Sequence, residues 1–223
     1  MSDRAVRPEA GDPAGHDFDE AYWEQHWQDR AAGDGATGSI PPNPYLARET
    51  GGLVPGTALD AGCGAGAEAL WLAAHGWQVT AADISAAALA RAADRAASSE
   101  AAHRVRWLQA DLSSWAPDTQ FDLVTTSYAH PAMPQLEFYD RIAGWVAPGG
   151  TLLVVGHLHG HAAHVEGHQP PAHASVTAAV VTARLGGAGW DVVTAEEPHR
   201  TVTAPDGRTT SLRDVVVRAT RRA

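Results

Sequence analysis

Short apolar runs alternate with amphipathic stretches along the chain from residue 57 onward. The runs of strand length lie at 57–60, 78–82, 105–108, 121–126 and 151–155. Between them, apolar residues recur at helical spacing at 68–75, in the Ala-rich stretch after Ser85, and at 136–146. Ser85 is a suitable N-cap, because its hydroxyl can accept from an amide of the first turn. Strands and helices that alternate at this spacing predict a parallel sheet covered by helices.

The N-terminal part of the chain follows another pattern. Residues 1–17 are polar and contain Pro and Gly, which predicts a mobile arm. A helix that carries several aromatic residues is expected at 19–32, and a short helix at 45–49 follows a loop rich in Gly and Pro. We therefore expect a mobile arm at 1–17, an N-terminal helical segment at 18–50 and one α/β domain at 51–223.

The C-terminal part of the chain ends in two apolar runs without a helix between them. A helix is expected at 177–185, and strands follow at 190–196 and 211–220. The turn signal Pro205-Asp206-Gly207 separates these two strands. They are therefore expected to pair antiparallel.

Composition narrows the class of protein. A chain of 223 residues with 44% apolar content can bury one substantial core. Its net charge of −10 argues against sequence-independent binding to nucleic acid, and the absence of lysine is typical of a GC-rich bacterial genome. The single cysteine excludes an internal disulfide. The chain shows no signal peptide or membrane span, so a soluble cytoplasmic protein is expected.

The loop after the first strand of the α/β domain carries a distinctive spacing. Asp60 precedes three glycines at every second position, Gly62, Gly64 and Gly66, and Cys63 lies between two of them. Such glycines let the backbone approach a ligand closely. The Asp60 carboxylate would repel a phosphate and suits an amine or ribose hydroxyls. Cys63 is interpreted as a small residue in a crowded turn rather than as a nucleophile.

Further candidate ligand-binding residues follow the next strands, at the sheet edge where ligands of such folds bind. Asp83 and Ile84 come after the second strand, Asp111 and Leu112 after the third, and Ser127 after the fourth. An acidic residue after the second strand can accept both ribose hydroxyls. Asp111 can accept from an adenine amine while the Leu112 amide donates to the ring. The alternative is structural, with Asp83 capping a helix and Asp111 forming a turn.

Together, the glycine loop and the acidic residues after the strands resemble the motifs of class I S-adenosylmethionine-dependent methyltransferases, over about residues 57–156. The resemblance implies S-adenosylmethionine as cofactor and S-adenosylhomocysteine (SAH) as product. It implies that Asp60 and the glycine loop hold the methionine end, Asp83 the ribose, and Asp111 with Leu112 the adenine. It also implies an α/β fold in three layers (α/β/α), Rossmann-like, with a seven-stranded, mostly parallel sheet and an antiparallel C-terminal hairpin.

Two other functions fit part of this pattern. Gly62-x-Gly64-x-x-Ala67 also matches the dinucleotide fingerprint, so the glycines alone leave an NAD(P)-dependent oxidoreductase open. Asp60, Asp111 and the terminal hairpin argue against it. A non-catalytic or partner-activated S-adenosylmethionine-binding protein also stays open, because a fold does not guarantee chemistry.

The aromatic helix expected at 19–32 has two interpretations. Trp23 and Trp27, followed by Asn43-Pro44-Tyr45-Leu46, resemble the N-terminal segment of thiopurine and tellurite-resistance type methyltransferases. That resemblance implies that 18–50 is a lid, with Trp27 at the cofactor and Trp23 in the substrate pocket. Aromatic faces also suit a sulfonium cation. The alternative is plain core packing, which aromatic residues at helical spacing commonly show.

Histidines follow the last two parallel strands. Tyr128 and His130 come after the fourth strand and His157 after the fifth, so all three are expected in the substrate pocket. His130 can act as a general base for a hydroxyl, amine or thiol, or it can merely line the pocket. The six histidines from His157 to His173 form a solvated loop, a substrate-facing loop or a metal site. We expect the solvated loop and no metal.

The predicted activity is methyl transfer to a small molecule. The chain has no basic face for nucleic acid and no added recognition domain, and a lid would enclose the acceptor. We therefore expect neither nucleic acid nor membrane as a partner. The sequence leaves the acceptor atom and the oligomeric state open.

Overall fold

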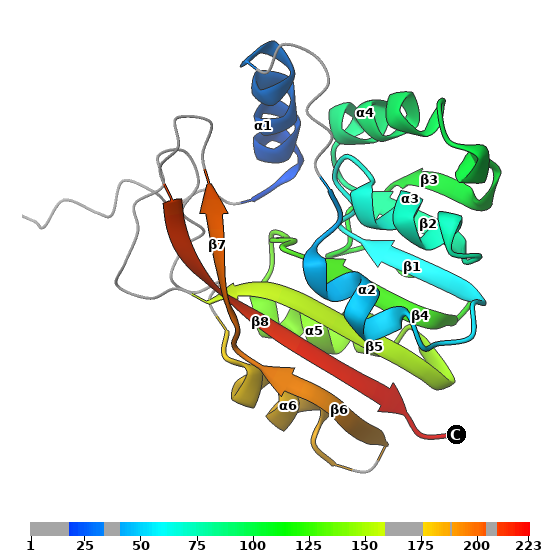
Figure 1. Ribbon diagram of the computed structural model, residues 1–223, viewed down its shortest axis with the longest axis vertical. Helices are drawn as coiled ribbons and strands as arrows, with labels where there is room; N and C mark the ends of the chain where they lie inside the picture. Colours follow the sequence, from blue (N-terminus) through cyan, green and yellow to red (C-terminus); the bar gives the residue numbers. More distant parts are fainter. Residues whose placement is uncertain (1–17, 34–40, 159–175, 188, 204–208) are drawn as a thin grey trace, which may run out of the picture.

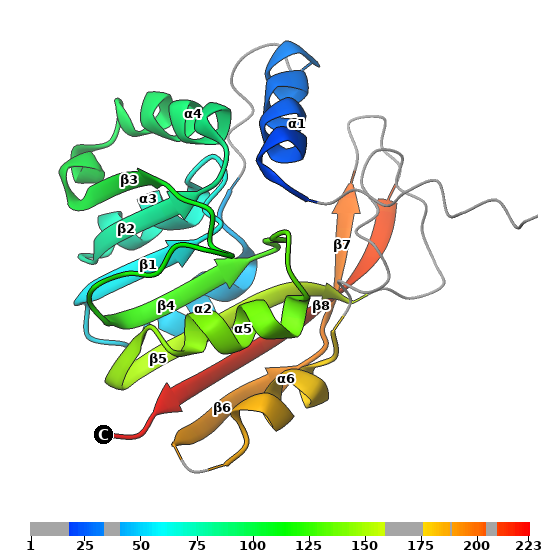
Figure 2. The same ribbon diagram turned by 180° about the vertical axis from the view of Figure 1, so that it is seen from behind.

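The structure is a computed structural model that describes residues 18–33, 41–158, 176–187, 189–203 and 209–223. One sheet with helices on both faces forms its body (Figures 1 and 2). The predicted arm at 1–17, the turn at 205–207 and the histidines from His159 to His173 lie outside the described residues. In the described residues no helix is long and apolar enough to cross a bilayer.

The parallel part of the sheet contains the strands that the alternating pattern predicts. These are β1 (Thr57–Ala61), β2 (Gln78–Asp83), β3 (Val105–Gln109), β4 (Phe121–Ser127) and β5 (Val146–Leu158). The strand order across the sheet is β3-β2-β1-β4-β5, followed by β8 (Thr209–Arg221) and β6 (Trp190–Glu196), so the order reverses beside β1. Ligands of open parallel sheets bind at such a reversal, beyond the carboxyl ends of the strands.

The predicted antiparallel pairing at the C-terminus is confirmed, but the prediction of seven strands is wrong. The described residues form eight strands, because β8 (Thr209–Arg221) is long enough to pair with two partners. Its second half pairs with β6 (Trp190–Glu196) and its first half with β7 (His199–Thr203). The strands β6 and β7 therefore lie one after the other along the same side of β8, where the prediction had a single strand.

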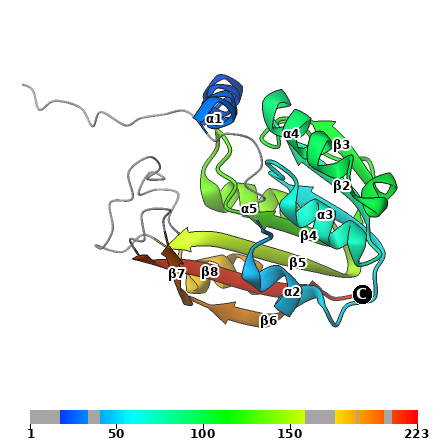
Figure 3. The same ribbon diagram turned by 45° about the horizontal axis from the view of Figure 1, so that its top comes forward.

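Helices cover both faces of the sheet and form a core on each side (Figure 3). On one face, α2 (Pro44–Thr50) and α3 (Ala67–Ala74) bury Leu46 and Leu72. On the other, α5 (Gln135–Ala143) and α6 (Ala178–Leu185) pack against the sheet with residues such as Ile142 and Val181. The predicted three-layer α/β/α architecture is confirmed.

Two further helices lie near the reversal in strand order. The predicted cap of α4 (Ala86–Ala96) is confirmed, since the Ser85 hydroxyl accepts from the Ala88 amide. The aromatic helix α1 (Glu20–Gly33) lies apart from the sheet and beside α4 (Figures 1 and 2). A short 3-10 helix, η1 (Glu100–Arg104), precedes β3 and was not predicted.

Candidate functional site

A cavity of about 670 Å³ lies between α1 and the carboxyl ends of the parallel strands. Most of the site residues predicted from the sequence line it: Trp23, Trp27, Gly62, Cys63, Gly64, Asp83, Ile84, Asp111, Leu112, Ser127, Tyr128, His130 and His157. Asp60 and Gly66 do not line it. The topology therefore gathers residues from the loop after β1 to the end of β5 around one space.

Asp83 connects the glycine loop to the start of α4. One carboxylate oxygen accepts from the Gly64 amide at 2.7 Å, and the other accepts from the Ser85 amide at 3.0 Å. Burial raises the pKa of Asp83, and these backbone donors oppose that shift. Since a carboxylate can accept about four hydrogen bonds, Asp83 keeps capacity for two further donors from the cavity.

Asp60 lies beneath the cavity rather than in its wall. Its side chain is buried, and its Oδ2 atom has no hydrogen-bond partner among the described residues. Burial, followed by the negative charges of Glu68 and Asp83, raises its pKa well above the usual range. Glu68 does line the cavity, and its carboxylate accepts from the Asn43 amide at 2.9 Å. Three acidic side chains thus converge below the glycine loop and favour a cationic group.

The three glycines of the loop have positive φ angles, but they contact different neighbours. At Gly64, with φ of +49°, an added Cβ would lie 2.8 Å from the ring of Trp27. At Gly66, with φ of +75°, it would lie 2.5 Å from the ring of Trp107. Gly64 therefore lets α1 approach the loop, whereas Gly66 lets the loop pack on β3.

Asp111 forms a turn at the end of β3. Its carboxylate accepts from the Ser113 amide at 2.8 Å and from the hydroxyls of Ser113 and Ser114. Burial acts to raise the pKa of Asp111, but the hydrogen bonds from these serines outweigh it and lower the pKa. The structural interpretation of Asp111 as a turn residue is thus confirmed. Its contact with adenine stays a prediction for a residue that does line the cavity.

Helix α1 is fixed over the cavity by polar contacts. Glu24 accepts from the Ser85 hydroxyl at 2.8 Å and from the Ala87 amide at 3.0 Å, so it caps α4 from a distant part of the chain. These hydrogen bonds lower the pKa of Glu24. The Trp23 indole donates to the backbone carbonyl of His130 at 3.0 Å. Sequence reasoning did not single out Glu24, because its partners lie more than sixty residues away.

At the other end of the cavity, aromatic rings and charges gather around a buried carboxylate. The ring of Tyr128 stacks on His157 with centroids 4.2 Å apart, and the Arg200 guanidinium lies 5.4 Å from the Tyr128 centroid. Arg200 donates to Asp214 at 2.5 Å, and the Tyr45 hydroxyl donates to the same oxygen at 3.0 Å. The side chain of Asp214 is fully buried.

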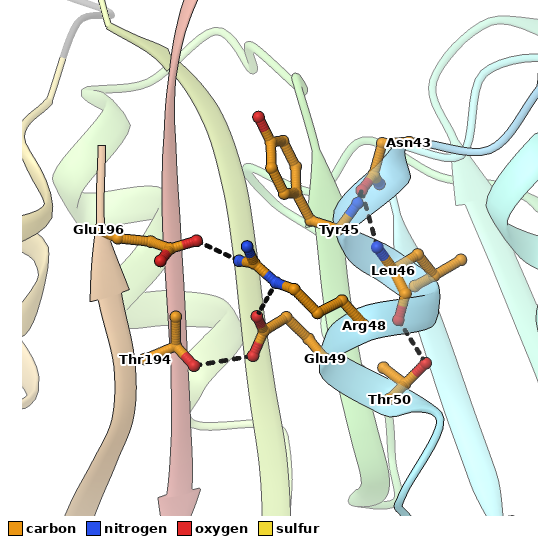
Figure 4. Close-up of polar contacts among 8 residues, drawn as sticks. All are labelled: Asn43, Tyr45, Leu46, Arg48, Glu49, Thr50, Thr194 and Glu196. Atoms are coloured by element: carbon orange, nitrogen blue, oxygen red, sulfur yellow. Dashed lines mark hydrogen bonds and ion pairs between the residues drawn. The ribbon is translucent and has the colours of Figure 1, made fainter. Parts of the chain in front are cut away.

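Tyr45 of this cluster belongs to helix α2, whose polar contacts are drawn in Figure 4. Asn43 caps the helix by accepting from the amides of Tyr45 and Leu46. Further along, Glu49 accepts from the Thr194 hydroxyl at 2.8 Å, and Arg48 forms ion pairs with Glu49 and with Glu196 of β6. Helix α2 is therefore capped at its N-terminal end, and its last turns are held to the edge strand β6.

Comparison with known proteins identifies the central part of the chain. Residues 58–150 match the family model described as a methyltransferase domain. This segment is therefore similar to methyltransferase domains. It contains the glycine loop, Asp83 and Asp111, so the resemblance seen in the sequence is confirmed.

Relatives and solved structures agree with this assignment. An uncharacterized methyltransferase of Mycobacterium tuberculosis is 41% identical over 99 residues, which are 44% of this chain and 48% of the relative. A probable thiol methyltransferase of Arabidopsis thaliana is 30% identical over 138 residues, 60% of each chain. The chain thus matches only about half to three fifths of these relatives. The solved structure of DhpI with SAH has the same fold, with a TM-score of 0.63, 22% identity and coverage of 92% and 96%.

Two further observations concern reactive side chains. Burial raises the pKa of the Cys63 thiol well above its usual range, which keeps it protonated and agrees with its interpretation as a small loop residue. Among the described residues, no group of three or more His, Cys, Asp or Glu side chains is arranged to hold a metal ion. The histidines beyond His157 lie outside that description.

Sequence reasoning missed Arg200 and Asp214. Both belong to the C-terminal strands β7 and β8, outside the segment that matches the methyltransferase family. No motif marks them, and an Arg or Asp in a strand carries no signal of its own. Only the antiparallel return of β8 beside β5 brings Asp214 opposite His157.

Proposed function

We propose that this protein transfers a methyl group from S-adenosylmethionine to a small-molecule acceptor and releases SAH. The observation that carries the proposal is the cavity of the methyltransferase domain, where acidic side chains converge on the glycine loop beneath an aromatic helix. The buried Oδ2 atom of Asp60 without a partner among the described residues, and Glu68 beside it, fit a ligand with an ammonium group.

In this proposal the predicted cofactor residues keep the roles that the resemblance implies, with one addition. Glu68 and the charge of Asp60 behind it would attract the ammonium of the methionine end. Asp83 would accept the ribose hydroxyls, and Asp111 with Leu112 would meet the adenine. When bound, the cofactor supplies an electrophilic methyl group on a positively charged sulfur. The chain itself orients the two reactants and excludes water from between them.

A small acceptor is favoured by the way in which α1 covers the cavity. Trp23 and Trp27 of α1 line the cavity, and Glu24 fixes the helix to α4. A space of about 670 Å³ has the size of a small-molecule site. The similarity to a protein named as a probable thiol methyltransferase supports the same class of acceptor. We also propose that residues 18–50 act as a lid.

Binding and transfer can be tested separately. Isothermal titration of the full chain with SAH should show one site per chain, and NAD should not bind. Incubation with S-adenosylmethionine labelled in its methyl group and a panel of phenols, thiols and amines should then label an acceptor. SAH binding without transfer to any acceptor would favour the non-catalytic alternative. Failure to bind SAH would contradict the proposal.

A further inference from the structure

The buried carboxylate of Asp214 has two unequal oxygens. Its Oδ2 atom accepts from Tyr45 and Arg200, at 3.0 Å and 2.5 Å. Its Oδ1 atom has no hydrogen bond among the described residues, and the Nδ1 atom of His157 lies 3.5 Å from it. A buried carboxylate oxygen without a donor is costly, so a proton on Nδ1 of His157 is favoured.

A proton on Nδ1 determines what the other ring nitrogen can do. Neutral imidazole carries one N–H and one lone pair, so Nε2 of His157 is then the acceptor. The His157 side chain is 30% exposed and lines the cavity, while its ring is held by stacking on Tyr128. The cavity thus contains an oriented imidazole whose free lone pair can receive a proton.

The charges around His157 support a proton acceptor more than those around His130. His157 faces the Asp214 carboxylate, whose charge stabilises an imidazolium and is partly balanced by Arg200. Its near ring neighbours are Tyr128 and His130, and burial raises the pKa of Tyr128, which keeps that phenol uncharged. The Nδ1 atom of His130 instead faces the uncharged Gln135 amide oxygen at 3.2 Å. A carboxylate oxygen thus faces Nδ1 of His157, whereas an amide oxygen faces Nδ1 of His130.

We propose that His157 accepts the proton of a hydroxyl-bearing methyl acceptor, and that Asp214 is the positioning residue that keeps the proton on Nδ1. This rests on the proposed methyl transfer and moves to His157 the role predicted for His130. The acceptor O–H bond breaks, and its proton passes to Nε2 of His157. The oxygen bonds to the methyl carbon, and the electron pair of the broken methyl–sulfur bond stays on sulfur, which becomes neutral. The imidazolium then returns its proton to water.

The tautomer of His157 is the first test and needs no turnover. The full chain, labelled with ¹⁵N-histidine and saturated with SAH, should show His157 with its proton on Nδ1. In Asp214→Asn, the amide oxygen would turn toward the two donors Tyr45 and Arg200. The amide NH₂ would then face His157 and move the ring proton to Nε2, as in triads that lose their carboxylate.

Two internal references make this test decisive. His130 should keep its tautomer in Asp214→Asn, because its partner is Gln135. Tyr45→Phe should leave His157 unchanged, because it removes a donor to Oδ2 only. His157 with its proton on Nε2 in the unsubstituted protein, or an unchanged tautomer in Asp214→Asn, would overturn the role of Asp214. Equal SAH affinity of the variants shows that they are folded.

Kinetics tests the proton transfer itself, with 4-methylphenol and thiophenol as acceptors. A phenol with a pKa of about 10 needs a base near neutral pH, whereas thiophenol is largely ionised there. His157→Gln should lower turnover of the phenol relative to thiophenol by about 10²- to 10⁴-fold. His130→Gln should keep that ratio, and Asp214→Asn should shift it in the same direction as His157→Gln.

The outcomes separate this inference from the proposed function. If His157→Gln lowers both reactions equally, or if only thiophenol is methylated by the unsubstituted protein, His157 is not the proton acceptor. If SAH does not bind, or if no acceptor is methylated, the proposed function fails. The tautomers of His157, recorded on the protein without SAH, would still decide whether Asp214 positions the ring.

Discussion

The Asp60 carboxyl is buried next to two other acidic side chains, and this environment affects the stability of the whole chain. Its pKa is raised by burial and then by the charges of Glu68 and Asp83. A carboxyl with a higher pKa in the folded than in the unfolded chain binds its proton more tightly when folded. Protonation therefore stabilises the fold, and this contribution is lost as the pH rises through the folded-state pKa. Asp60 thus opposes folding at neutral pH, a cost that functional sites commonly carry.

Asp60→Asn should accordingly stabilise the ligand-free protein at neutral pH. The melting temperature of the variant should exceed that of the parent near pH 8. The difference should shrink as the pH falls below the folded-state pKa of Asp60 and toward about 4, where the carboxyl of the unfolded chain is protonated as well. Thermal unfolding followed by circular dichroism across about pH 4 to 8 measures this. The exposed pair of Asp191 and Arg222 provides a control, since Asp191→Asn should show no such gain. A variant less stable than the parent near pH 8 would contradict the interpretation.

Asp83 differs from Asp60 because both of its oxygens are positioned by backbone donors. In Asp83→Asn, one oxygen becomes an NH₂ group that faces the amide of Gly64 or Ser85. A hydrogen bond to a charged acceptor contributes about 1.5–3 kcal/mol. Its loss should therefore weaken SAH binding by about 10- to 100-fold. Isothermal titration measures this, with Asp191→Asn again as the control. Unchanged affinity would mean that Asp83 is structural and does not contact the ribose.

At the scale of elements, α1 and α4 form a unit around the glycine loop. Glu24 supplies α4 with a carboxylate at its positive N-terminal end, and Ser85 supplies the usual cap from the chain itself. Trp27 meets Gly64, where any side chain would force the indole away. The aromatic residues of α1 therefore both pack against the domain and cover the cavity. Packing by these residues is therefore compatible with the proposed role of the helix as a lid.

Trp27→Ala tests whether α1 acts as a lid. The substitution removes the aromatic ring above Gly64 and should weaken SAH binding by about tenfold or more, since a deeply packed aromatic contact at a binding site contributes roughly 2 kcal/mol or more. Gln25→Ala on the exposed side of the same helix is the matched control and should bind like the parent. Equal affinity of Trp27→Ala and parent would leave α1 with a packing role alone.

Glu24→Gln tests how the helix is held. A capping side chain contributes about 1 kcal/mol. Weakening this cap should therefore raise the population of chains with α1 undocked by about fivefold. Hydrogen exchange measured by mass spectrometry should then become faster in α1 and in the first turn of α4, with the strands β1 and β4 unchanged. Faster exchange throughout the sheet would mean that Glu24 stabilises the whole domain rather than the docking of α1.

At the scale of the whole molecule, the antiparallel strand β8 contributes to one end of the site. It lies between β5 and β6 and carries Asp214 opposite His157. The methyltransferase domain match ends at residue 150, so this part of the site belongs to the C-terminal strands. The cofactor side and the proposed acceptor side of the cavity are thus built from different parts of the chain. Acceptor choice can change without change in the glycine loop.

A ligand that binds only the folded chain raises its melting temperature. SAH at about one hundred times its dissociation constant should stabilise the fold by about 2.7 kcal/mol. For a chain of this size that corresponds to a rise of about 5–10 °C, because each kcal/mol shifts melting by about 2–4 °C. Scanning fluorimetry with SAH and with NAD in parallel measures both. A shift with NAD and none with SAH would restore the dinucleotide interpretation.

The sequence by itself determined the order of the parallel strands and of the helices between them, and it indicated S-adenosylmethionine as the cofactor. Apolar periodicity is local, so it marked the parallel strands and their helices, and the cap at Ser85 followed from one hydroxyl and its position. Asp83 and the glycines were recognisable because the chemistry near the turn of one strand and helix is written in consecutive residues. Even so, the sequence could not show that Asp60 lies below the cavity or that Gly66 faces Trp107.

Only the tertiary structure decided the acceptor side. His157, Asp214, Arg200 and Tyr45 come from β5, β8, β7 and α2, and no spacing along the chain relates them. The presence of two strands, β6 and β7, at this edge of the sheet likewise depends on the length of β8, which pairs with both. Hydrogen bonds and burial between distant segments are set by how the chain closes on itself. Local motifs in the sequence therefore indicate the cofactor, whereas the residues proposed to activate the acceptor can be recognised only in the folded chain.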